Sequence, residues 1–230
     1  MATSGHTLKA FEEELEELRT AISEMGQLAE MAIRDSMEAL TTRTLALTAA
    51  AVERDVRIDE IESDVERRAI RIMALRAPLA NDLREVVAAL KISGVVERIG
   101  DYAKNIAKRV PLIEYSKIEP ISLLPEMARV AGEMVSEALE AFSARDAAKA
   151  AMVLGRDQVV DNFYNSIFRA LLTVMMEDAH TITAAAHLLF VAKHLERIGD
   201  HATNVAEMVY FADTGQHIPD RHRGEDLETI

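Results

Sequence analysis

The sequence contains no cysteine and no tryptophan, and only 9 glycines and 5 prolines among its 230 residues. Without cysteine the chain can form no disulfide, thiolate metal site, iron–sulfur cluster or cysteine nucleophile. Aromatic residues make up only 4% of the chain, whereas β-sandwiches and barrels need aromatic or β-branched strands and a turn about every 8–12 residues. These absences exclude an all-β fold and favour a chain built from helices.

Basic charge and long apolar runs are also scarce. Lys and Arg number 26 against 39 Asp and Glu, which gives a net charge of −13. Such a surface repels phosphate backbones, so we expect no nucleic-acid partner. No uncharged apolar run approaches the roughly 18 residues of a membrane span, so we expect no direct membrane insertion. The first residues turn acidic at once, unlike a secretory signal peptide, and we expect a cytoplasmic protein.

Helical periodicity fills most of the chain. The pattern predicts six long helices, over residues 6–40, 45–75, 80–110, 124–143, 147–176 and 180–212. Pro111, Pro120 and Pro125 are too dense for a helix interior and separate the third helix from the fourth. The sequence therefore predicts an all-α fold of two three-helix bundles, residues 1–115 and 116–212. A polar, loosely ordered tail is expected over residues 213–230.

The two halves repeat each other. Residues 97–107 read ERIGDYAKNIA and residues 196–206 read ERIGDHATNVA, so eight of eleven positions are identical at an offset of 99. RDVRID at 54–59 also matches RDQVVD at 156–161, at an offset of 102. Two matched blocks in the same order indicate a tandem duplication of a three-helix unit.

Both repeats retain acidic pairs spaced by four residues, at positions that share one helical face. The residues are Asp55, Asp59, Glu97 and Asp101 in the first half, and Asp157, Asp161, Glu196 and Asp200 in the second. Like charges at this spacing repel by roughly 0.2–0.5 kcal/mol. A bound hard cation such as Mg²⁺, Mn²⁺, Ca²⁺ or ferric iron would explain why they are kept. A solvated helix face is the alternative.

Other patterns carry less chemistry. Gly100 and Gly199 interrupt their helices, and leave room for an ion or for the close approach of another helix. Four histidines spaced by seven form a stripe, for which a helical surface or an interface is the preferred interpretation: His180, His187, His194 and His201. No P-loop, Rossmann glycine motif or G-x-S-x-G elbow is present, and we expect no enzymatic activity.

Two copies of E-R-I-G-D-x-A-x-N-x-A, each preceded one helix earlier by an Asp-x-x-x-Asp pair, resemble the PhoU family of bacterial phosphate-signalling regulators. The resemblance spans roughly residues 8–212. It implies two three-helix bundles side by side, commonly assembled as a homodimer. It also implies a negative regulator of the phosphate-starvation response. The implied partners are a sensor histidine kinase (PhoR-like) and the ATPase subunit of the phosphate ABC transporter (PstB-like).

The resemblance further implies a multinuclear metal, iron or zinc in some family members and manganese or magnesium in others. The implied ligands are the eight carboxylates named above. Glu62 and Glu66 continue the first acidic stripe, whereas Tyr164 and Phe168 stand at the matching positions of the second. This predicts more or tighter-bound metal in the first half. A metal-binding helical protein that stores ions or carries out metal-dependent phosphate chemistry remains the alternative function.

Overall fold

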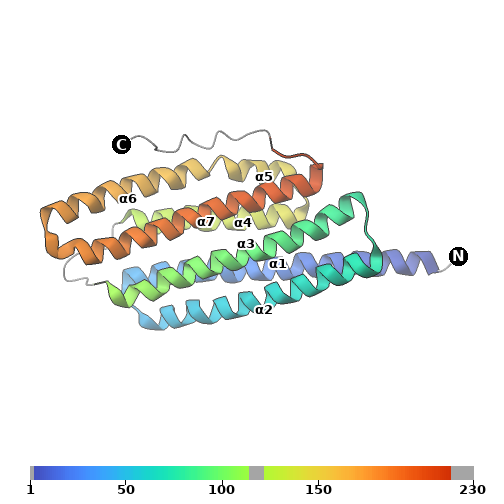
Figure 1. The fold of residues 1–230 in the computed structure, drawn as a ribbon, viewed down its shortest axis with the longest axis horizontal. Coiled ribbons are helices and arrows are strands. Elements are labelled where there is room, and N and C mark those ends of the chain that lie inside the picture. Colours follow the sequence, from blue (N-terminus) through green and yellow to red (C-terminus); the bar gives the residue numbers. More distant parts are fainter. Residues whose placement is uncertain (1–2, 114–121, 219–230) are drawn as a thin grey trace.

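The computed structural model describes residues 3–113 and 122–218 (Figure 1). Every regular element in these residues is a helix, so the all-α class is confirmed. The elements are α1 (Thr3–Thr42), α2 (Leu45–Arg76), α3 (Ala80–Arg109), η1 (Val110–Leu112), α4 (Leu123–Ala144), α5 (Ala147–Leu154), α6 (Asp157–Glu177), η2 (Ala179–Thr181) and α7 (Ile182–Thr214). Most of the tail expected to be loosely ordered, residues 219–230, lies outside the described residues.

The helices form the two expected bundles. Helices α1, α2 and α3 pack against one another, and α4 and α7 pack with α5 and α6 in the same way. The bundles meet through α3 against α7 and α1 against α4. Figure 1 shows α3 and α7 side by side and running in opposite directions. Four helices thus make the middle of the molecule, with α2 on one flank and α5 and α6 on the other.

Three helix ends follow from local backbone chemistry. Arg43, Ala77 and Arg145, which directly follow α1, α2 and α4, adopt left-handed backbone angles with φ of 61°, 46° and 52°. Pro78 comes next after Ala77 and cannot continue a helix, which explains the break expected between α2 and α3. Asp146 then begins α5, because its side chain accepts a hydrogen bond from the Lys149 backbone N–H at 2.9 Å.

The structure differs from the sequence pattern in the fifth helix. One helix was expected over residues 147–176, but the chain divides it into α5 and α6 at Gly155 and Arg156. Their backbone N–H groups bond to the carbonyls three residues earlier, on Met152 and Val153. Glycine is the weakest ordinary helix former apart from proline, so the break falls where the intrinsic propensity is lowest. Hydrophobic periodicity does not register such a break because both segments keep the same buried face.

A continuous apolar core fills both bundles and the contact between them. Gly26 of α1 shows how closely the bundles approach, because a Cβ atom at that position would lie 2.2 Å from Cδ1 of Leu139 on α4. None of the helices in residues 3–113 and 122–218 combines the length with the apolar character that a membrane-spanning segment requires.

Candidate functional site

The first acidic site comprises Asp55 and Asp59 of α2 with Glu97 and Asp101 of α3. Asp55 is only 3% exposed. Partial burial and the nearby charges of Asp55 and Asp101 raise the pKa of Asp59. Burial and the carboxylates of Asp101, Asp59 and Asp55 likewise raise the pKa of Glu97. The packing of α2 against α3 thus brings together all four carboxylates that the first repeat contributes.

A lysine that the sequence analysis did not single out lies inside this site. The Lys104 ammonium donates to Asp55 Oδ2 at 2.6 Å and also contacts Asp101 Oδ1. It therefore bridges α2 and α3. The other oxygen of Asp55, Oδ1, is buried and has no hydrogen-bond partner among the described residues. The sequence does contain a signal for this contact, because Asp101 and Lys104 are three residues apart and such pairs are neighbours on a helix surface.

The motif glycines serve the approach of the helices. A Cβ atom on Gly100 would lie 2.9 Å from Cδ1 of Ile58 and 3.6 Å from Asp55 Oδ1. A Cβ atom on Gly199 would lie 3.2 Å from Cγ1 of Val160 on α6. Of the two interpretations given by the sequence, close helix packing is the one that the structure supports. The same packing positions the Asp55 side chain against α3.

The second acidic site comprises Asp157 and Asp161 of α6 with Glu196 and Asp200 of α7. Two causes raise the pKa of Asp200 to about 6. The larger is desolvation of its carboxylate, and the smaller is the negative charge of Glu196, Asp157 and Asp161. The packing of α6 against α7 repeats what α2 and α3 do in the first bundle.

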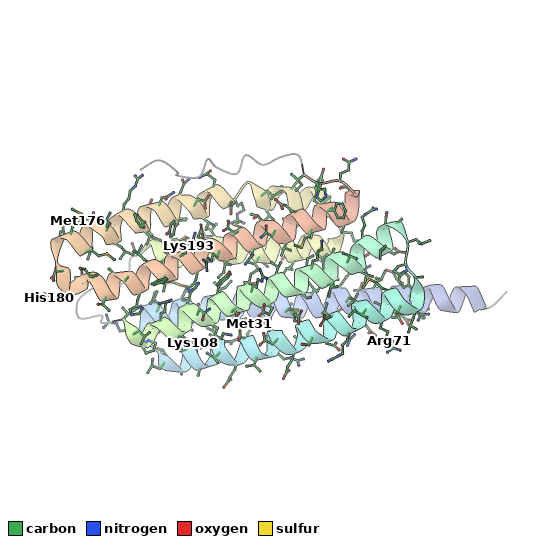
Figure 2. The ribbon with its side chains drawn as sticks, in the orientation of Figure 1. Met31, Arg71, Lys108, Met176, His180 and Lys193 are labelled. Carbon is green, nitrogen blue, oxygen red and sulfur yellow. The ribbon has the colours of Figure 1, made fainter. Side chains whose placement is uncertain are left out.

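A different lysine is found at the second site. Lys193, labelled in Figure 2, lies on α7 and contacts Glu196 Oε1 of the same helix at 2.6 Å. Its ammonium also lies 5.3 Å from the ring centre of Tyr164 on α6. The second oxygen of Glu196, Oε2, is buried without a hydrogen-bond partner in the described part of the chain.

Each site offers carboxylate oxygens alone, the donor set that suits hard cations. A buried acceptor is left over in each, Asp55 Oδ1 and Glu196 Oε2. No group of three or more His, Asp or Glu side chains in the described residues is already arranged around one ion position. The carboxylate donors fit a hard cation. Because no such group is already arranged around one position, the carboxylates would have to move closer together to coordinate an ion.

The two sites differ at their margins, as the sequences do. Burial and the charges of Glu66 and Asp59 raise the pKa of Glu62, which extends the acidic stripe of the first site along α2. At the matching positions of α6, the rings of Tyr164 and Phe168 lie 6.4 Å apart. Aromatic surface replaces carboxylate there.

The histidine stripe lies mainly at the contact between bundles. Tyr102 of α3 stacks on His194 and on His201 of α7, with ring centres 5.5 and 5.4 Å apart. Arg109 of α3 lies 3.3 Å from Nδ1 of His187. Three of the four histidines therefore occupy an interface, as the sequence suggested, while His180 is exposed on η2. No local sequence pattern predicted that Tyr102 and Arg109 contact these histidines.

Comparison with known proteins agrees with the repeat. The PhoU domain matches residues 22–110 and 124–209, once in each bundle. A phosphate-specific transport system accessory protein PhoU homolog of Zymomonas mobilis is 55% identical over 224 residues, covering 97% of this chain and 94% of that protein. The homolog of Caulobacter vibrioides is 46% identical over 217 residues, covering 93% and 94%.

Solved structures show the same fold. The crystal structure of PhoU from Pseudomonas aeruginosa has a TM-score of 0.85 at 34% identity, covering 90% of this chain and 100% of that one. The phosphate transport system regulatory protein PhoU from Streptococcus pneumoniae gives a TM-score of 0.84 at 26% identity, covering 91% and 99%. This chain, with one PhoU domain in each of its two bundles, is a member of the PhoU family.

Proposed function

We propose that this protein is an accessory regulator of phosphate transport that represses the phosphate-starvation response when phosphate is plentiful. The observation that carries the proposal is the extent of the match: both bundles carry a PhoU domain, and relatives named as phosphate transport accessory proteins align over 93–97% of the chain. The repression itself, and the coupling of the transporter to a sensor histidine kinase, are what the family resemblance implies.

The physical mode of action in this proposal is binding without catalysis. Long paired helices present broad faces to a partner, and a regulator that binds one state of a kinase or transporter more tightly shifts its population toward that state. We therefore expect two partners, the ATPase subunit of the phosphate transporter and the sensor histidine kinase. We also expect assembly as a homodimer in the cytoplasm.

Deletion of the gene tests the regulatory function directly. In phosphate-replete medium the deletion strain should express a starvation reporter such as alkaline phosphatase at a high level, and a plasmid copy of the gene should restore repression. An unchanged reporter, in a strain with no second PhoU gene, would contradict the proposal. Co-purification with the tagged ATPase subunit tests the coupling, and sedimentation of the purified chain tests the homodimer.

The unpartnered oxygens of Asp55 and Glu196 favour one alternative, a metal-binding protein that stores ions or uses them in phosphate chemistry. Paired metal ions about 3.5–4 Å apart can hydrolyse phosphoesters. Assay of the purified chain with a panel of phosphoesters and Mn²⁺, Fe²⁺ or Zn²⁺ tests the second part. Absence of turnover with every metal eliminates it.

A further inference from the structure

An exposed apolar surface crosses α6 and α7 beside the second acidic site. We call it the α6/α7 patch, and its members, which are 41–53% exposed, are Phe168 and Leu172 of α6 with Ile182 and Phe190 of α7. The ring centre of Phe168 lies 6.4 Å from that of Tyr164, and the Tyr164 ring in turn faces the Lys193 ammonium of α7. Lys193 stands three residues after Phe190 on the same helix. These contacts join the two helices into one surface, and exposed apolar side chains that cluster in this way mark interaction sites.

The first bundle carries charge where the patch has its two phenylalanines. Glu66 matches Phe168 at the offset of 102, and Lys91 matches Phe190 at the offset of 99. Both charged side chains are exposed, while the other two positions are apolar in both halves. Because the two bundles share one fold, helix packing does not require phenylalanine at either position. Burial against another molecule would account for both.

Acidic groups are scarce around the patch, whereas basic groups adjoin it. Residues 162–195 contain only two of the 39 acidic residues of the chain, Glu177 and Asp178. The Arg109 guanidinium of α3 lies 4.2 Å from the ring centre of Phe190, and Arg197 follows Phe190 by two turns on α7. Among residues 3–113 and 122–218, no carboxylate pairs with either guanidinium. In a chain with a net charge of −13, unpaired guanidiniums beside an apolar surface favour an anionic partner.

We propose that the α6/α7 patch binds an amphipathic helix of a partner protein, with the apolar stripe of that helix against Phe168 and Phe190. Acidic side chains beside the stripe face Arg109 and Arg197. Two neighbouring helices present ridges against which a third helix packs. Fifteen residues separate Ile182 from Arg197, which corresponds to about 22 Å, so a partner helix of about four turns covers the surface. The inference rests on the regulatory function proposed above and names the kind of protein segment that the regulator recognises.

Two other occupants fit the patch less well. A second copy docked through the same patch would form an isologous interface, in which the basic margin of one copy meets that of the other. An anionic bilayer would press against Glu196, which adjoins the patch through its contact with Lys193, whereas a single helix can lie beside it. The net charge of −13 also opposes approach to such a bilayer.

Photo-crosslinking in cells tests which molecule covers the patch. The full-length chain carries p-benzoylphenylalanine in place of Phe190 or, as the matched control, in place of Lys91. We expect position 190 alone to capture a protein segment that, when sequenced by mass spectrometry, has apolar residues every three to four positions with Asp or Glu beside them. Capture of a second copy of this chain, of lipid, or of a segment without acidic residues overturns the proposal, as does equal capture from both positions or no capture at all.

Binding of a defined helix to the purified chain measures the contribution of single residues. The probe is a synthetic helix of about four turns, with leucine every three to four positions and glutamate on both sides of that stripe. Fluorescence anisotropy gives its Kd. We expect Phe190→Ser to raise the Kd by about tenfold or more, as loss of an aromatic anchor does, and Lys91→Ser to leave it unchanged. Arg197→Gln should raise the Kd at low salt and have less effect at high salt.

A second probe, with lysine in place of glutamate, separates charge from apolar attraction. It should bind the wild type about tenfold more weakly than the first. Equal binding of the two probes, or equal effects of Phe190→Ser and Lys91→Ser, contradicts the proposal. The deletion reporter described above tests the regulatory function without using this surface. If the wild-type gene represses normally but its protein fails these binding measurements, the docking surface is overturned and the regulatory function is left intact.

Discussion

Tyr102 and His201 stand at equivalent positions of the two repeats and stack on each other across the contact between α3 and α7. Their ring centres are 5.4 Å apart and their planes are inclined by 15°. His194, two helical turns earlier on α7, also stacks on Tyr102, with ring centres 5.5 Å apart. One aromatic residue from the first bundle thus contacts two histidines of the second, and we expect protonation of these histidines to weaken the junction between the bundles.

Acid should destabilise the protein through His194. Burial, followed by the charges of Arg109 and Arg197, lowers the pKa of His194 to about 4 from an ordinary 6.5. Between these pH values the unfolded chain binds a proton that the folded chain does not, so stability falls as the pH falls. We expect the free energy of unfolding to drop by on the order of 2 kcal/mol through this residue between pH 6.5 and pH 4.

Denaturant unfolding of the wild type and His194→Leu across this range measures the effect. The difference between the two proteins should change with pH in favour of the variant as the solution becomes acidic. His180→Gln is the control, because His180 is exposed and outside the interface. A constant difference between wild type and His194→Leu from pH 7 to pH 4 contradicts the prediction.

Removing one charge from the second acidic site should stabilise the fold at neutral pH. The pKa of Asp200 is raised to about 6, so its ionised form costs free energy above that pH, and the cost disappears as the pH falls below the ordinary value of 3.8. We expect Asp200→Asn to have a higher melting temperature than the wild type at pH 7, with little difference near pH 4. Asp101→Asn is the matched variant and should not gain stability, because Asp101 contacts Lys104. Equal changes in melting temperature for Asp200→Asn and Asp101→Asn would contradict the raised pKa of Asp200.

Alanine at two mid-helix glycines should act in opposite directions. A Cβ atom on Gly94 meets nothing within 4 Å, so Gly94→Ala should stabilise the chain by about 0.5–1 kcal/mol through helix propensity. A Cβ atom on Gly26 would lie 2.2 Å from Cδ1 of Leu139, so Gly26→Ala forces the buried Leu139 side chain out of its present position between α1 and α4. Overpacking of this kind typically costs about 1–3 kcal/mol, and we expect a net loss. Thermal melts of both variants decide, and a stabilised Gly26→Ala protein would show that Leu139 moves aside freely.

Glu85 should be important for the junction between the bundles. Its two oxygens accept from Arg19 Nε of α1 at 2.6 Å and from Arg145, after α4, at 2.7 Å. Arg19 and Glu85 are only 8% and 9% exposed. Glu85→Ala leaves the buried Arg19 guanidinium with only its exposed partners, Glu12 and Glu16, and should cost about 1.5–3 kcal/mol. Denaturant unfolding measures this loss.

The control for Glu85 is an exposed ion pair. Glu126 faces Arg129 at 3.0 Å, and both side chains are more than half exposed. Glu126→Ala should therefore change the free energy of unfolding by less than about 1 kcal/mol. Similar losses for Glu85→Ala and Glu126→Ala would show that the Glu85 contacts add little to the junction.

Local pattern was enough to predict most helices, because each repeats a buried face every three to four residues over a long stretch. The division at Gly155 was missed because the hydrophobic period continues through it. The repeat also grouped the eight carboxylates by bundle. Whether they bind metal stays a prediction.

Contacts between helices could not be predicted in the same way. Tyr102 meets His194 and His201 only because α3 packs on α7, and no local spacing encodes that pairing. The contact of Lys104 with Asp101 could have been predicted from their spacing of three residues. The bridge from Lys104 to Asp55 depends on how closely α2 approaches at Gly100, a distance set by packing.

The antiparallel pairing of equivalent helices has a further consequence. When residue 102 of one repeat faces residue 201 of the other, the contact has the form of an isologous interface, in which the same patch occurs on both sides. In two separate copies of one repeat, any substitution at such an interface appears twice. Joining the copies in one chain removes that constraint, so tyrosine can face histidine, and lysine can occupy one carboxylate site while threonine stands in the other. Covalent linkage thus allows the two halves of a symmetric assembly to acquire different chemistry while the shared fold is kept.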